Sequence, residues 1–219
     1  MNFSAEYIEA EYQRRTQGKA DKCWGWSFMY VPQERLHTAK VMLVGLNPGG
    51  RELNPPINEW HYEAGINAYV DEAWAGLEAG QHPLQQQVSL LFEAMGVDAS
   101  EVFAANFVPF RSPSWRDLDD PIGALEFSQD LWRHMISLSP ARLFLSLGKE
   151  AGRQVAAVTG STYQASYPVG WGRQTIDAFS NDQGQIVLSL PHLSRFRVFG
   201  NGRTQAAEVV QRTVREMYR

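Results

Sequence analysis

The chain has too few cysteines and histidines for several kinds of site. Its 219 residues include one cysteine, which excludes an intrachain disulfide and any cluster or zinc site built on several thiolates. Among its five histidines, the nearest approach to metal-ligand spacing is Glu59-Trp60-His61, a weak pattern. We therefore predict no metal and no cofactor.

Long apolar runs are also missing. No stretch approaches the roughly 20 apolar residues that span a bilayer, and the first residues carry no basic segment followed by an apolar one. A hydrophobic content of 44% and a charged content of 20% are ordinary for a globular chain. These features predict a cytoplasmic protein without a membrane partner, folded as a single domain over residues 1–219.

Positive charge is scarce over the whole chain but not near its C-terminal end. The formal net charge of −4 argues against a protein that coats nucleic acid without sequence preference. Residues 191–219 nevertheless contain six arginines and two glutamates. This segment is predicted to be either a basic face that holds a few phosphates or a solvated charged helix.

Four short runs are continuously apolar, which is typical of strands buried on both faces of a sheet. They cover residues 41–44, 102–105, 143–147 and 186–190. Helical patterns lie between and around them, at residues 4–16, 83–95, 121–138, 149–158 and 204–218. This alternation predicts an α/β fold, a three-layer α/β/α sandwich with a central four-stranded parallel sheet.

Three segments are less regular. Within residues 1–37, aromatic residues after the first helix alternate with a period of two, which predicts an extended stretch packed into the core. They are Trp24, Trp26, Phe28 and Tyr30. Residues 51–82 form an irregular, insertion-like region that we expect to wall a ligand site. Residues 159–185 are predicted to be a long loop or a hairpin around Trp171.

Polar residues follow each of the four apolar runs. Because the carboxyl ends of parallel strands meet at one edge of a sheet, these residues are expected to lie together, and ligands of such sheets bind at that edge. The four segments are Gly45-Leu46-Asn47-Pro48-Gly49, Asn106-Phe107-Val108-Pro109-Phe110-Arg111, Gly148-Lys149 and Pro191-His192-Leu193-Ser194-Arg195.

The first of these segments continues into Gly50 and is rich in glycine. It lacks the G-x-G-x-x-G spacing of dinucleotide-binding proteins, and no Gly-Lys-Ser/Thr follows it. These absences disfavour dehydrogenases and nucleoside triphosphatases. Taken alone, the segment is also typical of a tight strand-to-helix turn in which Asn47 bonds its own backbone.

In order along the chain, the four segments resemble the motifs of the uracil-DNA glycosylase superfamily. Gly45 to Gly49 is similar to its first catalytic motif, above all in the single-strand-selective and mismatch-specific or thymine-DNA branches. Asn106 matches an asparagine that reads the base, residues 147–151 resemble a leucine-glycine-x-x-alanine stretch, and His192-Leu193-Ser194 stands where the family carries histidine-proline-serine. The resemblance covers residues 38–200 and implies the fold of that family.

The resemblance also implies roles for individual residues. Asn47 would position the attacking water and His192 would stabilise the leaving base, although a lone histidine is also often structural. Asn106 would read the base, and Gly45 and Leu46 would line its pocket. An aromatic ring should stack on the base, and the sequence leaves three candidates: Trp60, Tyr62 and Phe110.

Other residues near the four segments are predicted to contact DNA, which an enzyme of this kind must bind in order to flip a base. They are Pro48, Gly49, Arg111, Ser112, Lys149, Ser194, Arg195 and Phe196. Alternatives remain open for three of them. Phe196 also suits core packing, Ser112 suits a capping role, and Lys149 suits an exposed helix start.

The sequence thus predicts a monomeric DNA glycosylase acting on uracil or another altered base in single- or double-stranded DNA. It would be monofunctional, because the water-bearing motif has no lysine that could form a Schiff base. Two alternatives remain. One is a non-catalytic protein of the same fold that binds nucleic acid or a base. The other is a nucleoside or nucleotide N-glycosidase, whose activity would depend weakly on salt.

Overall fold

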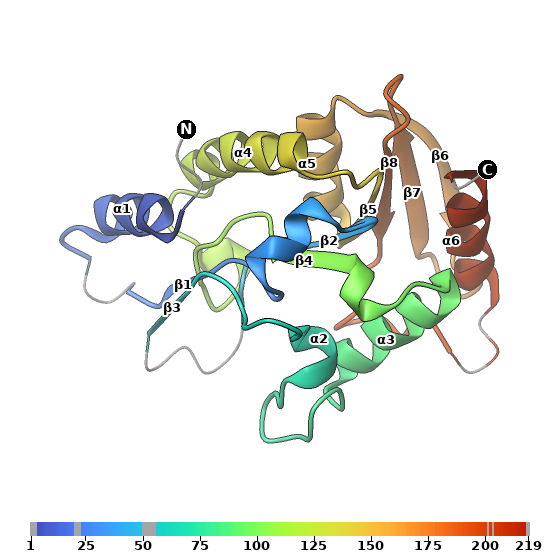
Figure 1. Ribbon diagram of the computed structural model, residues 1–219, viewed down its shortest axis with the longest axis horizontal. Coiled ribbons are helices and arrows are strands. Elements are labelled where there is room, and N and C mark those ends of the chain that lie inside the picture. Colours follow the sequence, from blue (N-terminus) through green and yellow to red (C-terminus); the bar gives the residue numbers. More distant parts are fainter. Residues whose placement is uncertain (1–3, 20–22, 50–55, 201, 203, 218–219) are drawn as a thin grey trace.

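The structure is a computed structural model that describes residues 4–19, 23–49, 56–200, 202 and 204–217. Its centre is a six-stranded sheet of order β4-β2-β5-β8-β7-β6 (Figure 1). The strands are β2 (Val41–Gly45), β4 (Val102–Asn106), β5 (Leu143–Leu147), β6 (Thr162–Pro168), β7 (Thr175–Ser180) and β8 (Ile186–Leu190). The first four in the sheet order run parallel, whereas β7 is antiparallel to both β8 and β6.

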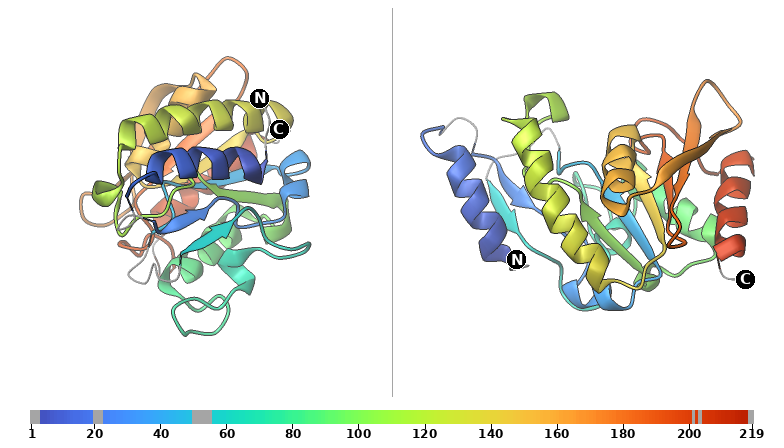
Figure 2. Two further views of the ribbon diagram at one scale, coloured as in Figure 1. Left: turned by 90° about the vertical axis from the view of Figure 1, so that its left-hand side faces the viewer. Right: turned by 90° about the horizontal axis from the view of Figure 1, so that it is seen from above.

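Helices flank the sheet. One side carries α1 (Ala5–Thr16), α4 (Pro121–Leu138) and α5 (Lys149–Thr159), and the other carries α2 (Ala68–Asp71) and α3 (Pro83–Met95) (Figures 1 and 2). Helix α6 (Thr204–Met217) packs against α3 and β6. The prediction of an α/β protein with a mostly parallel central sheet is therefore confirmed. In the described part of the chain, no helix combines the length and apolar character needed to cross a membrane.

The helix boundaries follow from local signals in the sequence. Ser4 accepts a bond from the Tyr7 N–H and caps α1. Asp120 accepts a bond from the Gly123 N–H at the start of α4, and Pro121 occupies the first turn. Helix α3 ends at Gly96, whose φ of 66° is accessible to glycine at little cost. The helices predicted at 83–95 and 121–138 are confirmed at both ends.

The predicted number of strands is wrong, because the sheet has six strands and not four. The extra strands, β6 and β7, form a hairpin within residues 159–185. Strand β6 is the sheet edge and is mostly exposed, so it lacks the continuous apolar run that marks the other strands. The hairpin alternative for this segment is the correct one.

A second, two-stranded sheet pairs β1 (Gly25–Ser27) with β3 (Ile57–Glu59). The alternating aromatic segment is extended as predicted, with Trp26 and Phe28 in the core. The insertion-like region contributes β3 and α2, and its residues 51–55 lie outside the described residues, as do Gly50 and Tyr218.

The register of the parallel strands sets the position of the predicted site. Gly45 pairs with Asn106, and Leu147 pairs with Leu190, so β2, β4, β5 and β8 end at the same level. The four polar segments therefore leave the sheet at one edge, in the spatial order β4, β2, β5, β8.

Candidate functional site

The segments that follow β2 and β4 run side by side beyond the sheet. Phe107 donates its N–H to Gly45 O at 2.7 Å, and Val108 donates to Leu46 O at 2.8 Å. Ser112 N donates to Pro48 O at 3.2 Å. These bonds hold the backbone of the glycine-rich segment along a fixed partner, so its side chains are positioned by β4 and not by a local turn alone.

Asn47 is held by its amide nitrogen. Nδ2 donates to Ser112 Oγ at 2.8 Å and also lies 3.4 Å from the carbonyl oxygens of Phe110 and Pro48. Because a carbonyl oxygen only accepts, these contacts identify the atom facing them as Nδ2. Among the described residues, no donor reaches Oδ1. The side chain is thus held through Nδ2, and its acceptor Oδ1 remains for a ligand.

Ser112 has a different position from the one expected of a DNA contact. It is fully buried, and its hydroxyl donates to Ser114 O at 2.9 Å while accepting from Asn47. It is therefore placed to orient Asn47. The predicted DNA contact is not favoured by this burial.

Removing the Ser112 hydroxyl should loosen Asn47. For Ser112→Ala we expect any reaction that uses Asn47 to slow about fivefold, because one neutral hydrogen bond contributes about 1 kcal/mol. Single-turnover rates measure the effect, with Ser137→Ala, an exposed serine on α4, as the matched control. A variant as fast as the control would contradict this role.

Asn106, the last residue of β4, is 3% exposed. Its Nδ2 donates to Ser27 O at 3.3 Å and to Tyr30 Oη at 3.0 Å. Since Ser27 O only accepts, the orientation of the amide is fixed as it is for Asn47. The atom of this carboxamide that remains for a ligand is Oδ1, a hydrogen-bond acceptor.

Gly45 packs close to that oxygen, where no side chain would fit. A Cβ atom built on Gly45 would lie 2.6 Å from Asn106 Oδ1 and 3.7 Å from its Cγ. Any side chain here would collide with the carboxamide and occupy the space above the end of β2. Glycine at this position therefore lets the Asn106 carboxamide keep its place at the end of β2.

His192 follows β8 at the same edge and is exposed as a residue. Its ring lies against Gly148, because a Cβ on that glycine would be 3.5 Å from His192 Cδ2. Its Nδ1 is 2.7 Å from Ser194 Oγ. Partial burial of the ring, and then the positive charge of Arg195, lower the pKa of His192 from its ordinary value. The imidazole is therefore neutral at pH 7.

The segment after β8 is anchored by a residue that the sequence did not single out. Gln87 on α3 is buried, and its Oε1 accepts from Val198 N at 2.6 Å and from Phe199 N at 2.9 Å. Its Nε2 donates to Phe199 O at 3.1 Å. Leu193, where the family resemblance has proline, is 2% exposed. Together these two side chains tie residues 192–199 to the core.

Replacing Gln87 by methionine, a side chain of similar length, should release this segment. We expect the free energy of unfolding to fall by about 1–3 kcal/mol, because backbone N–H and C=O groups lose their buried partners. Denaturant titration measures this loss, and Gln86→Met supplies the control, because Gln86 is the exposed neighbour. Equal stability of the two variants would contradict the anchoring role.

The three aromatic candidates now differ. Phe110 is 3% exposed and packs against Tyr12 and Phe127, so its ring lies in the core under α1 and α4. Trp60 is half-buried, with its ring beside Phe28. Tyr62 stacks on Tyr30 with 6.4 Å between ring centroids, and Tyr30 bonds Asn106. Tyr62 is therefore the candidate linked to the site.

The predicted DNA contacts separate in the same way. Lys149 Nζ forms an ion pair with Asp177 Oδ2 at 2.7 Å and donates to Thr175 O, so both of its partners lie on β7. The half-buried Arg111 donates to Trp24 O at 3.0 Å. The residues that stay exposed are Gly49, Ser194 and Arg195, whereas Pro48 is buried and Phe196 is half-buried near Trp171.

The site is defined by the side chains that follow the carboxyl ends of four parallel strands. Two surface hollows lie elsewhere, one beside Arg15 and Phe110 and one between Tyr167 and α6. Within the described residues there is no group of three or more histidine, cysteine or acidic side chains that could hold a metal ion.

Neither protein-family models nor curated protein sequences match this chain.

Proposed function

We propose that the protein is a monofunctional DNA glycosylase on a fold of the uracil-DNA glycosylase type. It would hydrolyse the N-glycosidic bond of uracil or another altered base flipped out of DNA. The observation that carries the proposal is the grouping at one sheet edge of two immobilised carboxamides, Asn47 and Asn106, with a neutral imidazole, His192. Each offers an acceptor or donor that this reaction requires.

In the proposed reaction, the bond between C1′ of the sugar and the base nitrogen breaks, and its electron pair leaves with the base. A water molecule held by Asn47 Oδ1 adds its oxygen to C1′. One water proton remains on the new sugar hydroxyl, and the other passes to the base or to solvent. An amide is too weak a base to deprotonate water, so bond cleavage runs ahead of water attack through a cation-like sugar.

His192 would stabilise the departing base. In the proposed arrangement the Ser194 hydroxyl, 2.7 Å from Nδ1, donates to that nitrogen, and the ring proton is then carried by Nε2. Nε2–H can then donate to a base carbonyl oxygen on which negative charge develops. Its lowered pKa favours the neutral ring, in which one nitrogen carries the proton and the other accepts.

Recognition would come from the two sides of this edge. Asn106 Oδ1 can accept a hydrogen bond from an N–H of the base. Tyr30, which accepts a hydrogen bond from Asn106, stacks on Tyr62. The exposed Arg195 can contact a phosphate next to the flipped nucleotide. The proposal requires no cofactor.

The test is abasic-site formation on a panel of single- and double-stranded oligonucleotides carrying uracil, hypoxanthine, xanthine, mismatched thymine or modified cytosine. Product with the wild type that is lost in Asn47→Ala establishes the activity and identifies the base. If the protein binds DNA but forms no product on any substrate, the glycosylase proposal is refuted and a non-catalytic nucleic-acid-binding protein is indicated. Cleavage of free nucleosides with weak salt dependence would indicate a nucleoside N-glycosidase.

A further inference from the structure

The arginine-rich end of the chain has no part in the cleavage proposed above. Two of its arginines, Arg212 and Arg215, are exposed on α6, which packs beside β6 at the edge of the sheet (Figure 1). A surface groove of about 540 Å³ lies between α6 and the C-terminal end of β6, and this volume is in the range of known ligand sites. We call it the β6–α6 groove. Its lining includes Tyr167, Pro168, Gln205, Glu208, Arg212 and Arg215.

Arg212 is held in this groove by an aromatic ring. Its guanidinium carbon lies 4.8 Å from the centroid of the Tyr167 ring, a cation–π contact. Glu208 stands four residues earlier on α6, the spacing of a helical ion pair. Within the described part of the chain, however, neither Arg212 nor Arg215 forms an ion pair. Contact with a ring face leaves the in-plane N–H groups of Arg212 for an acceptor from outside the chain.

The groove lies at the same end of the sheet as the candidate site. Strand β7 is antiparallel to both of its neighbours, so β6 runs parallel to β8. Ser166 pairs with Asp177, and Asp177 pairs with Ser189. Tyr167 is therefore level with the last residue of β8, two residues before His192. Two strand spacings, about 10 Å, separate β6 from β8.

Packed side chains join the groove to the segment that carries His192. Phe196 lies against Trp171, with 6.1 Å between ring centroids. The adjacent Gly170 lies against Gln205 at the start of α6, because a Cβ on Gly170 would be 3.1 Å from Gln205 Oε1. Since Gln205 also lines the groove, the turn between β6 and β7 contacts both the groove and the segment after β8.

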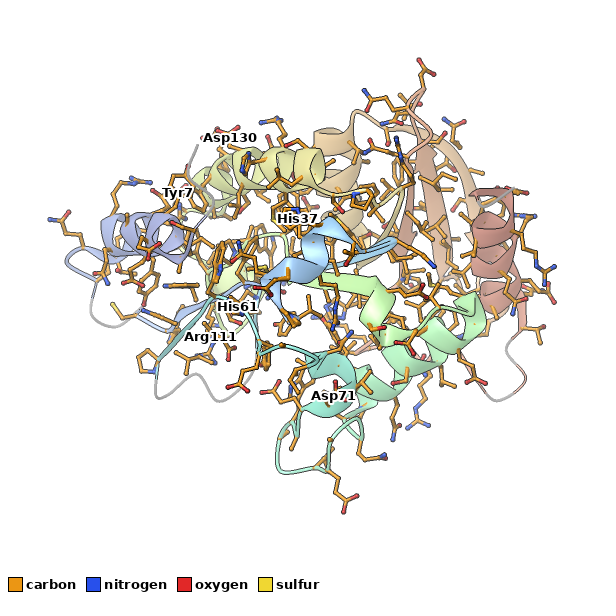
Figure 3. All side chains as sticks on the ribbon, in the orientation of Figure 1. Tyr7, His37, His61, Asp71, Arg111 and Asp130 are labelled. Atoms are coloured by element: carbon orange, nitrogen blue, oxygen red, sulfur yellow. The ribbon has the colours of Figure 1, made fainter. Side chains whose placement is uncertain are left out.

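The chemistry of the lining suits phosphate groups. It contains two arginines and one glutamate, so its formal charge is positive although the chain as a whole carries −4. A guanidinium can donate two parallel N–H bonds to one phosphate. The groove lies at the other end of the strand order from Arg111, which follows β4 and is labelled in Figure 3. A nucleic-acid strand that leaves the candidate site past β8 would therefore reach a second set of phosphate donors.

We propose that the β6–α6 groove is a phosphate-binding subsite for the nucleic-acid strand beyond the flipped nucleotide, in which Arg212, held over Tyr167, is the main donor and Arg215 assists it. This inference rests on the proposed function for the presence of a strand at this edge of the sheet. It gives the basic C-terminal segment a ligand and a place on the path of that strand.

The test is a binding measurement that needs no cleavage and no altered base. Dissociation constants would be measured at several salt concentrations for unmodified single-stranded oligonucleotides of about 4 and about 16 nucleotides, the range of single-strand sites on one small fold. The proteins are the wild type, Arg212→Gln, Tyr167→Leu and the control Arg133→Gln. Arg133 is the matched control because it is an exposed helical arginine, on α4, and its removal changes the net charge equally.

On the longer oligonucleotide, Arg212→Gln should weaken binding about fivefold at about 0.1 M salt and lower the slope of log affinity against log salt by about 0.7, the contribution of one phosphate contact in a single strand. Tyr167→Leu keeps the charge and should still weaken binding about two- to fivefold. On the shorter oligonucleotide, which does not reach the groove, Arg212→Gln and Arg133→Gln should agree within about twofold.

Three results would overturn the proposal: Arg212→Gln equal to Arg133→Gln on the longer strand, an equal loss on both lengths, or Tyr167→Leu equal to the wild type. Base release separates this inference from the enzyme proposal. Binding that depends on Arg212 and on length, without base release from any substrate, would refute the glycosylase and keep the groove. Base release with no effect of Arg212→Gln on binding would keep the glycosylase and refute the groove.

Discussion

The His192→Ala variant is expected to release base about 10²–10³-fold more slowly than the wild type, the usual effect of removing one preorganised donor from a developing anion. His192 has no anchoring role that would spread the damage, because its residue is exposed and its one described side-chain hydrogen bond is to Ser194. Single-turnover kinetics at saturating enzyme isolates the chemical step. A loss below tenfold would contradict the role of His192 in leaving-group stabilisation.

The dependence of the rate on pH distinguishes a histidine that acts in the reaction from one that only supports the structure. Burial, and then the charge of Arg195, lower the pKa of His192, so the neutral ring that the proposed reaction uses is favoured at pH 7 and is replaced by the charged ring as the pH falls. Because the unfolded chain binds this proton more readily, stability also declines in that range as the pH falls. The acid limb of the rate profile should be absent in His192→Gln. If the limb persists unchanged, another group is responsible for it.

Gly45→Ala is expected to lower base release by at least about 10²-fold while the protein stays folded. The added Cβ would lie 2.6 Å from Asn106 Oδ1, so the carboxamide must move, and small displacements of positioning groups have effects of this size. Gly45 does not have a positive φ, so alanine adds no backbone strain. Circular dichroism and the thermal midpoint check the fold, and single-turnover rates measure the loss.

The reason for that loss can be isolated with a second substitution. In an Asn106→Ala background the colliding oxygen is gone, so adding Gly45→Ala should slow the reaction by less than about tenfold. Full multiplication of the two losses would show that alanine at Gly45 acts by some other route than Asn106.

Much of the fold was predictable because its signals are local. The four buried parallel strands are continuous apolar runs, and the ends of α3 and α4 coincide with proline, a capping side chain or glycine. Strands β6 and β7 were predicted only as one of two alternatives, a loop or a hairpin, because an exposed edge hairpin needs no apolar run. The hairpin is stabilised by the pairing of β7 with β8, and sequence periodicity carries no signal of that pairing.

The candidate site was predictable at the level of strand ends and not at the level of partners. Which residues follow each strand is a local fact, so the placement of Asn47, Asn106 and His192 at one edge could be predicted. Their supports are distant in sequence. Ser112 is 65 residues from Asn47, and Gln87 is 111 from Val198. Contacts at such separations leave no periodic or spacing signal.

The same limit explains the residues whose surroundings differ from expectation. The sequence offered Lys149 either as a DNA contact or as an exposed residue at a helix start, but strand β7 brings Asp177 to it at 2.7 Å. Phe110 was an aromatic candidate beside the motif, and only the packing of α1 and α4 shows that its ring is enclosed.

The central claim is that Asn47 and His192 act on one bond of one bound base, and a double-variant cycle tests it most directly. Abasic-site formation would be measured in single turnover for the wild type, Asn47→Ala, His192→Ala and the double variant. Groups that act as a unit give losses that do not multiply, so the double variant is predicted to be within about tenfold of the slower single variant. Losses that multiply in full, or abasic product that none of the variants reduces, would contradict the account.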